Sequence, residues 1–374
     1  MAPSAGGRGL RVAIVGTGLV GASLGLALRR LEEVGDVAGY DRDAEQLALA
    51  LERGAITRAC ASAVEAVEDV DLAILAVPAS AVPAVAAQIG RSLRAGAILT
   101  DVASVKDRVV EALQAAAPDG VHVIGGHPMA GSHEVGAAHA SADLFVGATY
   151  LLTPTSHTDP GAYRLLHGLI ARMGARVIAV SPRRHDLLVA VVSHLPQLAA
   201  TTLMNLAAER ARDEHAGLLL LAAGGFRDAT RVAASNPELW LDICAENRDA
   251  IVAVLDDYAD RIGRLRTILA DGDDESLAAA LADARLARRG LPGKESITGE
   301  LVELTLPIPD RPGVLAEVTT TVGGAGVNIE DFRIEHAPEG GRGTLHLAVI
   351  GADQAAKARV ALEALGYEVG ELQS

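Results

Sequence analysis

Short apolar runs alternate with amphipathic segments along the first 150 residues. The runs at 10–16, 71–78 and 97–102 are rich in Val, Ile, Leu and Ala, which predicts strands, and a further strand is expected at 121–129. Between them, apolar residues recur three and four positions apart, which predicts helices. Strands that alternate with helices build a mostly parallel, doubly wound sheet, so we expect a Rossmann-like α/β domain over residues 1–183.

A different pattern covers residues 184–292. Two long helical runs, 185–212 and 238–272, are followed by a shorter one at 274–291. The two long runs carry too little polar surface to stand alone in water. We therefore expect an all-helical domain that is buried in a homodimer.

The last part of the chain alternates strand and helix again. Residues 298–374 read as strand, helix, two strands, helix and strand, which is the order of a ferredoxin-like α+β domain. The stretch 291–296 (LPGKES) is the expected linker in front of it.

The charge and composition exclude several classes of partner. The net charge is −15 and aromatic residues make up 2%, so we expect neither nucleic acid nor an anionic membrane as a partner. Residues 187–207 could span a bilayer by length, but they carry His194 and Gln197, which favours a buried helix near a site. Cys60 and Cys244 lie far apart and fit a reducing, cytoplasmic compartment.

The motif GTGLVG follows the first strand and opens a helix, which is typical of a dinucleotide site. Its glycines allow a tight turn and the close approach of a pyrophosphate to the helix N-terminus. Asp41 ends the second strand, where a carboxylate would take the ribose hydroxyls of NAD, while Arg42 leaves NADP open. A glycine-rich packing turn without a cofactor is the alternative. The predicted cofactor residues are Gly16, Gly18, Leu19, Val20, Gly21, Asp41, Arg42, Val77 and Pro78.

His127 and Ser104 follow neighbouring strands at the edge of the sheet where ligands bind. A His at this edge can act as a general base for a hydroxyl proton during hydride removal, and Ser104 can hydrogen-bond the same oxygen. A structural role for the His is the alternative. His194 lies in a helix with uncharged surroundings, where a buried, hydrogen-bonded histidine is expected.

Arg227 and Arg231 lie four residues apart and are expected on one helical face, where they could hold a carboxylate. An ion pair of Arg231 with Asp228 is the alternative. A bound anion would need such local cations against the acidic background. No spacing typical of a metal site occurs, so we expect no metal.

Five motifs occur in one order: GTGLVGASL, DVASVK, GGHPMAGS, SHLPQ and GFRDATRVAASNPELW. In this order, over residues 10–290, they resemble the prephenate/arogenate dehydrogenase family of tyrosine biosynthesis. In the tail, DRPGVLAEV and GVNIEDFRI resemble an ACT domain. Such domains bind amino acids at subunit interfaces.

The resemblance implies the NAD-dependent oxidative decarboxylation of prephenate to 4-hydroxyphenylpyruvate, with arogenate as the alternative substrate. His127 would accept the proton of the ring 4-hydroxyl, and Ser104 would position that hydroxyl and the nicotinamide. Arg231 would bind a substrate carboxylate, with Trp240 as nearby support. The implied substrate residues are Arg227, Arg231, Ser132, His185 and Gln197. In the tail, Asp310, Gly313 and Asn328 would lie in ligand loops for tyrosine, and a purely structural ACT domain is the alternative.

Two positions depart from the family pattern. Many members have His where Gln197 stands and Glu where His133 stands. The choice between prephenate, a keto acid, and arogenate, an amino acid, therefore stays open, and the ion pair that gates the site in the family is not carried over.

Two further functions compete with this one. A non-enzymatic sensor of NAD and amino acids would need neither His127 nor Arg231. A 6-phosphogluconate-type dehydrogenase would place a Lys in its active-site helix, whereas residues 187–207 contain none.

Overall fold

The computed structural model forms two compact units, residues 1–281 and 282–374, and each is described by itself. The residues that the structure describes are 9–130, 134–213, 217–291, 301–309, 314–329, 331–336 and 342–372.

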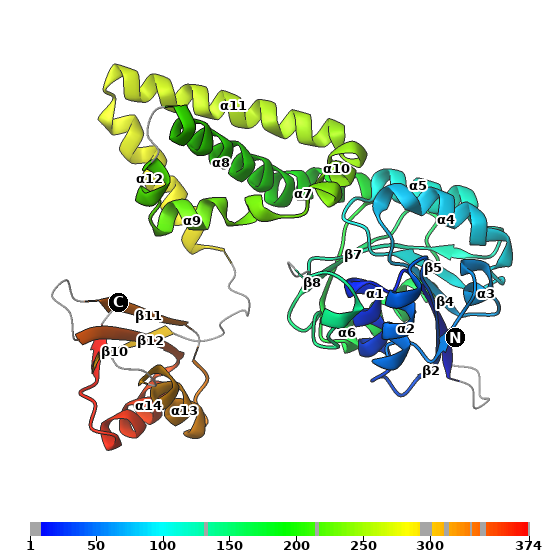
Figure 1. The fold of residues 1–374 in the computed structure, drawn as a ribbon, viewed down its shortest axis with the longest axis horizontal. Coiled ribbons are helices and arrows are strands. Elements are labelled where there is room, and N and C mark those ends of the chain that lie inside the picture. Colours follow the sequence, from blue (N-terminus) through cyan, green and yellow to red (C-terminus); the bar gives the residue numbers. More distant parts are fainter. Residues whose placement is uncertain are drawn as a thin grey trace. The chain divides into compact units, whose positions relative to one another are not determined.

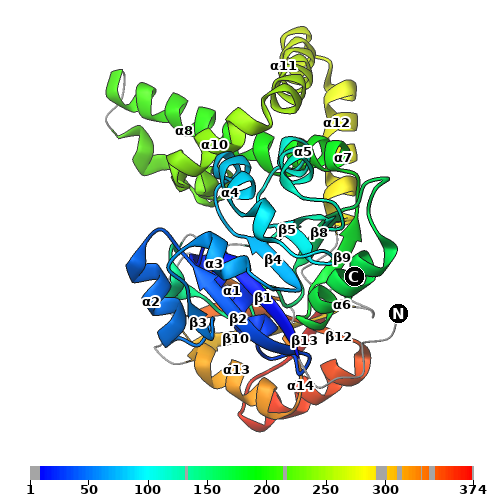
Figure 2. The same ribbon diagram turned by 90° about the vertical axis from the view of Figure 1, so that its right-hand side faces the viewer.

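The first unit contains a six-stranded sheet in the order β3-β2-β1-β4-β5-β6, and all its strand pairs are parallel (Figures 1 and 2). The strand order reverses between β1 and β4, where doubly wound sheets bind their ligands. The predicted Rossmann-like domain is confirmed. The strands are β1 (Leu10–Val15), β2 (Val34–Tyr40), β3 (Arg58–Ala59), β4 (Leu72–Leu75), β5 (Ile98–Asp101) and β6 (His122–Val123).

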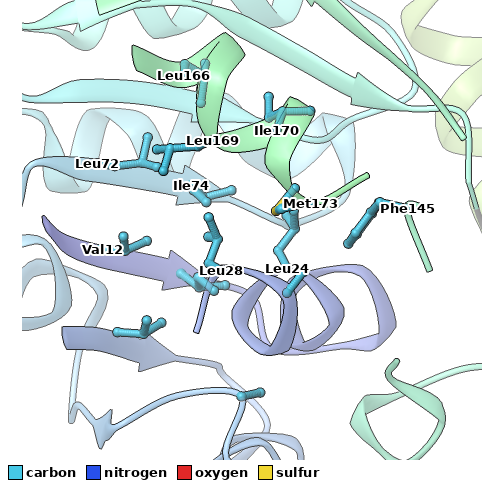
Figure 3. Close-up of a cluster of buried hydrophobic side chains, with 14 of the residues drawn as sticks. Val12, Leu24, Leu28, Leu72, Ile74, Phe145, Leu166, Leu169, Ile170 and Met173 are labelled. Carbon is cyan, nitrogen blue, oxygen red and sulfur yellow. The ribbon is translucent and has the colours of Figure 1, made fainter. Parts of the chain in front are cut away.

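Helices cover both faces of this sheet. Helices α1, α2 and α6 share one apolar core with it, and Figure 3 shows Leu166 and Ile170 of α6, and Met173 directly after α6, over the strands. Helices α3, α4 and α5 share the core of the opposite face. The helices are α1 (Leu19–Leu28), α2 (Ala44–Glu52), α3 (Ala63–Val67), α4 (Val82–Ile89), α5 (Asp107–Ala116) and α6 (Pro160–Arg172).

The prediction of one strand at 121–129 is wrong, because two short strands, β6 and β7 (Gly125–Pro128), occupy this stretch. The chain leaves the large sheet after β6, and β7 belongs to a second sheet with β8 (Thr149–Thr153) and β9 (Arg176–Ala179). The crossing is tight, because a Cβ at Gly126 would lie 2.6 Å from the Asp101 carbonyl oxygen. The two glycines of GGHP thus let β7 cross the end of β5.

The helical part of the first unit departs from the expected runs at two points. A π-helical turn, Ala190–His194, interrupts the first run before Pro196, which lacks the N–H of a regular helix. The second run breaks at Asn247, where φ is −114° and ψ is 31°. The helices are α7 (Pro182–Val189), α8 (Leu195–Asp213), α9 (Gly224–Thr230), α10 (Pro237–Glu246) and α11 (Arg248–Asp271), and α12 (Asp274–Arg289) begins in the first unit and ends in the second.

The run Pro182–Asp213 is long and apolar enough to cross a membrane by length and composition alone. Its buried polar side chains include Asp186 and His194, and both are hydrogen-bonded to other parts of the chain. It also packs beside α11 (Figure 1). The run is therefore tied into the fold of the first unit by hydrogen bonds and by packing, although only 28% of its apolar window is buried in the single chain.

The second unit carries the predicted ferredoxin-like order. Its antiparallel sheet has the order β11-β12-β10-β13 and packs against α13 and α14 through one apolar core. The elements are β10 (Leu301–Pro309), α13 (Val314–Gly324), β11 (Asp331–His336), β12 (Arg342–Ile350), α14 (Ala352–Ala364) and β13 (Gly370–Leu372).

Candidate active site

The glycine turn after β1 borders open space. Gly16 has a φ of +96°, and a Cβ there would lie 2.3 Å from the Ala76 carbonyl oxygen. A Cβ at Gly21 would lie 1.9 Å from the Gly16 carbonyl oxygen. At Gly18, in contrast, a Cβ would meet nothing within 4 Å. Packing therefore requires Gly16 and Gly21, whereas Gly18 leaves room for a ligand.

Charged and polar groups around this turn fit a dinucleotide. Helix α1 begins after Gly18, and no side chain of the described residues caps it, so its first N–H groups can bind a phosphate. Asp41 accepts hydrogen bonds from the backbone N–H groups of Thr17 at 2.6 Å and Asp43 at 2.9 Å. These bonds hold the carboxylate beside the turn, where it can bind ribose hydroxyls and disfavours a 2′-phosphate.

The other predicted cofactor residues surround the same turn. Leu19 and Val20 are half-buried at the start of α1. Val77 follows β4, and its Cγ1 would lie 3.1 Å from a Cβ at Gly16. Pro78 and Arg42 are exposed. The described chain therefore has the donors, the carboxylate and the space to hold NAD.

Three buried side chains form a hydrogen-bonded row beside the end of β5. His127 Nδ1 lies 2.8 Å from His185 Nε2, and His185 Nδ1 lies 2.8 Å from Asp186 Oδ1. Asp186 also accepts the backbone N–H groups of Lys106 at 2.7 Å and Asp107 at 2.8 Å, at the start of α5. His127 comes from β7 and the other two from α7, so the row joins two parts of the fold.

Burial keeps the histidines of this site neutral. Burial lowers the pKa of His127 well below its ordinary value of 6.5, and repulsion by Lys106, and by His185 and His194 whenever they are protonated, lowers this pKa further. Burial also lowers the pKa of His185, although its hydrogen bond to Asp186 opposes this. The pKa of His194 falls to about 4. A neutral imidazole at His127 can act as a general base near neutral pH.

A buried ion pair ties the Ser104 loop to the strand of His127. The Lys106 side chain is fully buried, and its Nζ donates to the Asp101 carboxylate and to the Gly126 carbonyl oxygen, the latter at 2.7 Å. Asp101 in turn accepts the Gly126 N–H at 3.2 Å. Ser104 lies between the two charged residues in sequence and is half-buried. The structure therefore holds the Ser104 loop and the backbone next to His127 as one piece.

The helical part brings further predicted residues together. Gln197 is buried on α8, and its Oε1 lies 3.4 Å from Ser235 Oγ, just after the turn that carries Arg231. His194 Nδ1 lies 3.2 Å from Asn247 Nδ2, and its ring stands edge-on to Trp240 with centroids 5.8 Å apart. The expectation of a buried, hydrogen-bonded His194 agrees with this geometry.

Two predicted placements change. His185 is fully buried and both of its ring nitrogens contact protein groups, so it stands behind His127 and has no ring nitrogen left for a substrate. Helix α9 ends at Thr230, so Arg227 and Arg231 do not share one α-helix. Within the described residues Arg231 forms no ion pair with Asp228, and its exposed side chain can accept an anion.

Three predicted residues, Ser132, Asp310 and Gly313, lie outside the described residues, as does His133. Asn328 is exposed after α13. Among the described residues, no group of three or more His, Cys, Asp or Glu side chains could hold a metal ion.

Sequence reasoning missed Asp186, Lys106 and Asn247. Lys106 closes the DVASVK motif, and Asp186 directly follows a histidine that had been singled out. The sequence pattern that could have indicated Asp186 is an acidic residue next to a histidine in a helix with few charges. Asn247 gave no signal, because a polar residue inside a helical pattern is ordinary.

Comparison with known proteins shows which family this chain resembles. Residues 24–179 match the family model described as "Prephenate dehydrogenase, nucleotide-binding domain", residues 181–283 match "Prephenate dehydrogenase, dimerization domain", and residues 307–366 match the ACT domain. The chain is 32% identical to a prephenate dehydrogenase of Bacillus subtilis, over 94% of this chain and 95% of that protein. It is 33% identical to a cyclohexadienyl dehydrogenase of Zymomonas mobilis, over 75% of this chain and 95% of that protein.

Solved structures agree. A prephenate dehydrogenase of Aquifex aeolicus, in complex with hydroxyphenyl propionate and NAD+, superposes with a TM-score of 0.70 at 29% identity, over 75% of this chain and 97% of that chain. An arogenate dehydrogenase of Synechocystis superposes with a TM-score of 0.67 at 31% identity, over 75% of this chain and 99% of that chain. The family matches follow one another along residues 24–283, and the chain belongs to the prephenate dehydrogenase family.

Proposed function

We propose that this chain catalyses the NAD-dependent oxidative decarboxylation of prephenate to 4-hydroxyphenylpyruvate. The observation that carries the proposal is a buried His127 on a strand that Lys106 ties to the end of the dinucleotide-binding sheet, because burial lowers the pKa of this imidazole and favours its neutral form. A sensor would have no use for such a base. The enzyme would work in the cytoplasm, in keeping with two free cysteines.

In this reaction His127 accepts the proton of the substrate's 4-hydroxyl while a hydride leaves the same carbon. Bound NAD+ supplies the acceptor for that hydride. The bond to the ring carboxylate then breaks, carbon dioxide leaves, and its electron pair completes the aromatic ring. His127 returns the proton to the phenolate oxygen, so the base is regenerated. Aromatisation supplies the driving force, and the protein contributes orientation and proton transfer.

The residues around this base take the remaining tasks. Ser104 positions the hydroxyl, and the Gly18 space, the α1 N-terminus and Asp41 hold the cofactor. Arg231 binds a substrate carboxylate, because its guanidinium is exposed and carries a permanent charge. Arg227 is also exposed, and its Nε donates to the Ala222 carbonyl oxygen at 3.1 Å. Its remaining N–H groups assist in the same anionic site.

Gln197 is the residue that would distinguish prephenate from arogenate. It is buried beside the Arg231 turn and is uncharged, so it can offer an amide N–H to a keto oxygen or an amide oxygen to an ammonium group. The dehydrogenases similar to this chain include one of each kind. We propose prephenate, with arogenate as the alternative.

Initial rates of NADH formation test the proposal. Prephenate and arogenate are each assayed with NAD and with NADP. We expect turnover with prephenate and NAD and little with NADP, because Asp41 repels a 2′-phosphate. Turnover with arogenate alone would keep the same base and cofactor site and move the specificity to Gln197. No turnover with either substrate would contradict the proposal.

We further propose a homodimer built on the helical part. Four large side chains of α11 that are spaced four, three and four apart are exposed in the single chain: Tyr258, Ile262, Leu265 and Leu269. This spacing is the seam of a helix that packs against another helix. An apolar seam of this length on one surface indicates an interface.

Tyrosine is the effector we propose for the ACT domain. Asn328 is exposed after α13, where a ligand loop of this domain would lie. Isothermal titration with tyrosine, together with rates measured at rising tyrosine concentration, tests this point. Absence of both heat and inhibition would leave the domain a structural role.

A further inference from the structure

The row from Asp186 to His127 determines where the protons of both histidines lie. Asp186 accepts the N–H groups of Lys106 and Asp107, one on each carboxylate oxygen. Backbone N–H groups donated to both oxygens favour the ionised form of a carboxylate, which has no proton to donate. The short contact with Asp186 therefore requires that His185 Nδ1 carries the hydrogen.

The position of the His185 proton fixes the position of the proton on His127. A neutral imidazole has one N–H, so His185 Nε2 holds a lone pair once Nδ1 is protonated. His185 Nε2 lies 2.8 Å from His127 Nδ1, which must then donate. His127 is left with its lone pair on Nε2, the nitrogen that faces away from His185. Each step follows from the carboxylate at the end of the row.

We propose that Asp186 and His185 are positioning residues that hold His127 as its Nδ1–H tautomer and so leave Nε2 free to accept the substrate proton. The proposal rests on the proposed function of His127 as the base. It also assigns a second effect to the pair. When His127 is protonated, its Nδ1–H remains hydrogen-bonded to His185, and the Asp186 carboxylate lies at the end of the row to stabilise the positive charge.

The surroundings keep the row in place. Asn247 donates to the Asp186 carbonyl oxygen at 2.9 Å, so the break between α10 and α11 fixes the backbone of this residue. The start of α5 faces the Asp186 carboxylate, and N–H groups at a helix N-terminus favour a negative charge. The other titratable groups that act on the two rings are His194, Lys106 and Asp101, of which Lys106 and Asp101 form an ion pair with each other.

Two substitutions at His185 separate hydrogen bonding from bulk. In His185→Gln the amide oxygen can accept the His127 Nδ1–H, so we expect kcat to stay within about tenfold of wild type. His185→Leu has similar volume but no acceptor, so we expect kcat to fall by about 10²- to 10⁴-fold, the usual contribution of a positioned base. The KM for prephenate and the Kd for NAD should stay near wild type in both. Equal kcat values in the two variants would overturn the proposal.

Asp186→Asn tests the far end of the row. The new amide can donate to His185 Nδ1, which would move the hydrogen to Nε2 and force His127 into the wrong tautomer. We expect a loss of kcat similar to that of His185→Leu. Thermal unfolding of each variant shows whether the fold survives.

Nitrogen-15 NMR of histidine-labelled protein reads the tautomer directly and needs no substrate. The His127 signals are assigned by their loss in His127→Asn, among the 11 histidines of the chain. In wild type we expect Nε2 at the shift of an unprotonated nitrogen, and in Asp186→Asn at that of a protonated one. A protonated Nε2 in neutral wild-type protein would overturn the proposal. Failure of prephenate turnover would instead contradict the proposed function and leave the NMR result standing.

Discussion

At the scale of single residues, His127 is the group that we propose as the base. Its ring is almost fully buried, and one nitrogen is already held by His185. We expect His127→Asn to lower kcat by about 10²- to 10⁴-fold, because an amide cannot take up the hydroxyl proton. NAD binding, measured by fluorescence titration, should be nearly unchanged, since the residues that we propose for the cofactor, the glycine turn and Asp41, stay as they are. Turnover at the wild-type rate would exclude His127 as the base.

The pH dependence of the reaction follows from the same burial. Only neutral His127 can accept a proton, and burial lowers its pKa well below the ordinary 6.5. Activity should therefore persist as the pH falls past 6.5 and decline only at more acidic pH. The pH at which kcat/KM for prephenate falls on the acidic side, obtained from initial rates, measures the pKa of His127 in the free enzyme. A fall of kcat/KM that is centred above pH 6.5 would contradict the expected lowering of this pKa.

Arg231 is the residue that we propose for substrate binding rather than for proton transfer. We expect Arg231→Gln to raise the KM for prephenate by about 10- to 150-fold, the range that corresponds to one hydrogen bond to a charged group. The Kd for NAD serves as the control, because the cofactor site uses other residues. An unchanged KM would show that the carboxylate binds elsewhere.

At the scale of elements, the buried pair of Lys106 and Asp101 joins β5 to β7. Lys106→Met leaves the Asp101 carboxylate buried without its cation, which is expected to cost about 3–5 kcal/mol of unfolding free energy. The exposed pair of Arg30 and Asp143 is the matched control, and Arg30→Met should cost less than about 1 kcal/mol. Urea unfolding of both variants measures the difference. Similar values for the two would contradict the role of the buried pair.

The elements also show how far the sequence could predict this protein. The parallel strands, the glycine turn and the ACT order were predictable, because each has a local period or a turn residue that marks it. The change of sheet after β6 was not, since the two glycines of GGHP fit a strand and a crossing equally well. The break at Asn247 depends on contacts with Asp186 and His194, which are far away in sequence. For the same reason, pattern alone could not place His185 behind His127.

At the scale of the whole molecule, the exposed seam of α11 predicts the oligomeric state. Ile262 and Leu265 are 48% and 38% exposed in the single chain, in the middle of the seam. A glutamate in an apolar interface loses its hydration without a partner, so Ile262→Glu should dissociate the dimer. Light scattering should give twice the chain mass of 38.4 kDa for wild type and the single chain mass for the variant.

The control for this prediction is an apolar side chain of similar exposure outside the helical part. Leu51 on α2 is 41% exposed, which is close to the exposure of Ile262. We expect Leu51→Glu to remain dimeric, because Leu51 is the one large apolar side chain of α2 that is exposed among the described residues, so α2 has no apolar seam. If Leu51→Glu and Ile262→Glu both stay dimeric, the subunits meet through another surface. If both dissociate, added charge rather than the α11 seam explains the effect. Only dissociation confined to Ile262→Glu identifies the helical part as the interface, since the two substitutions introduce the same charge at surfaces of similar exposure.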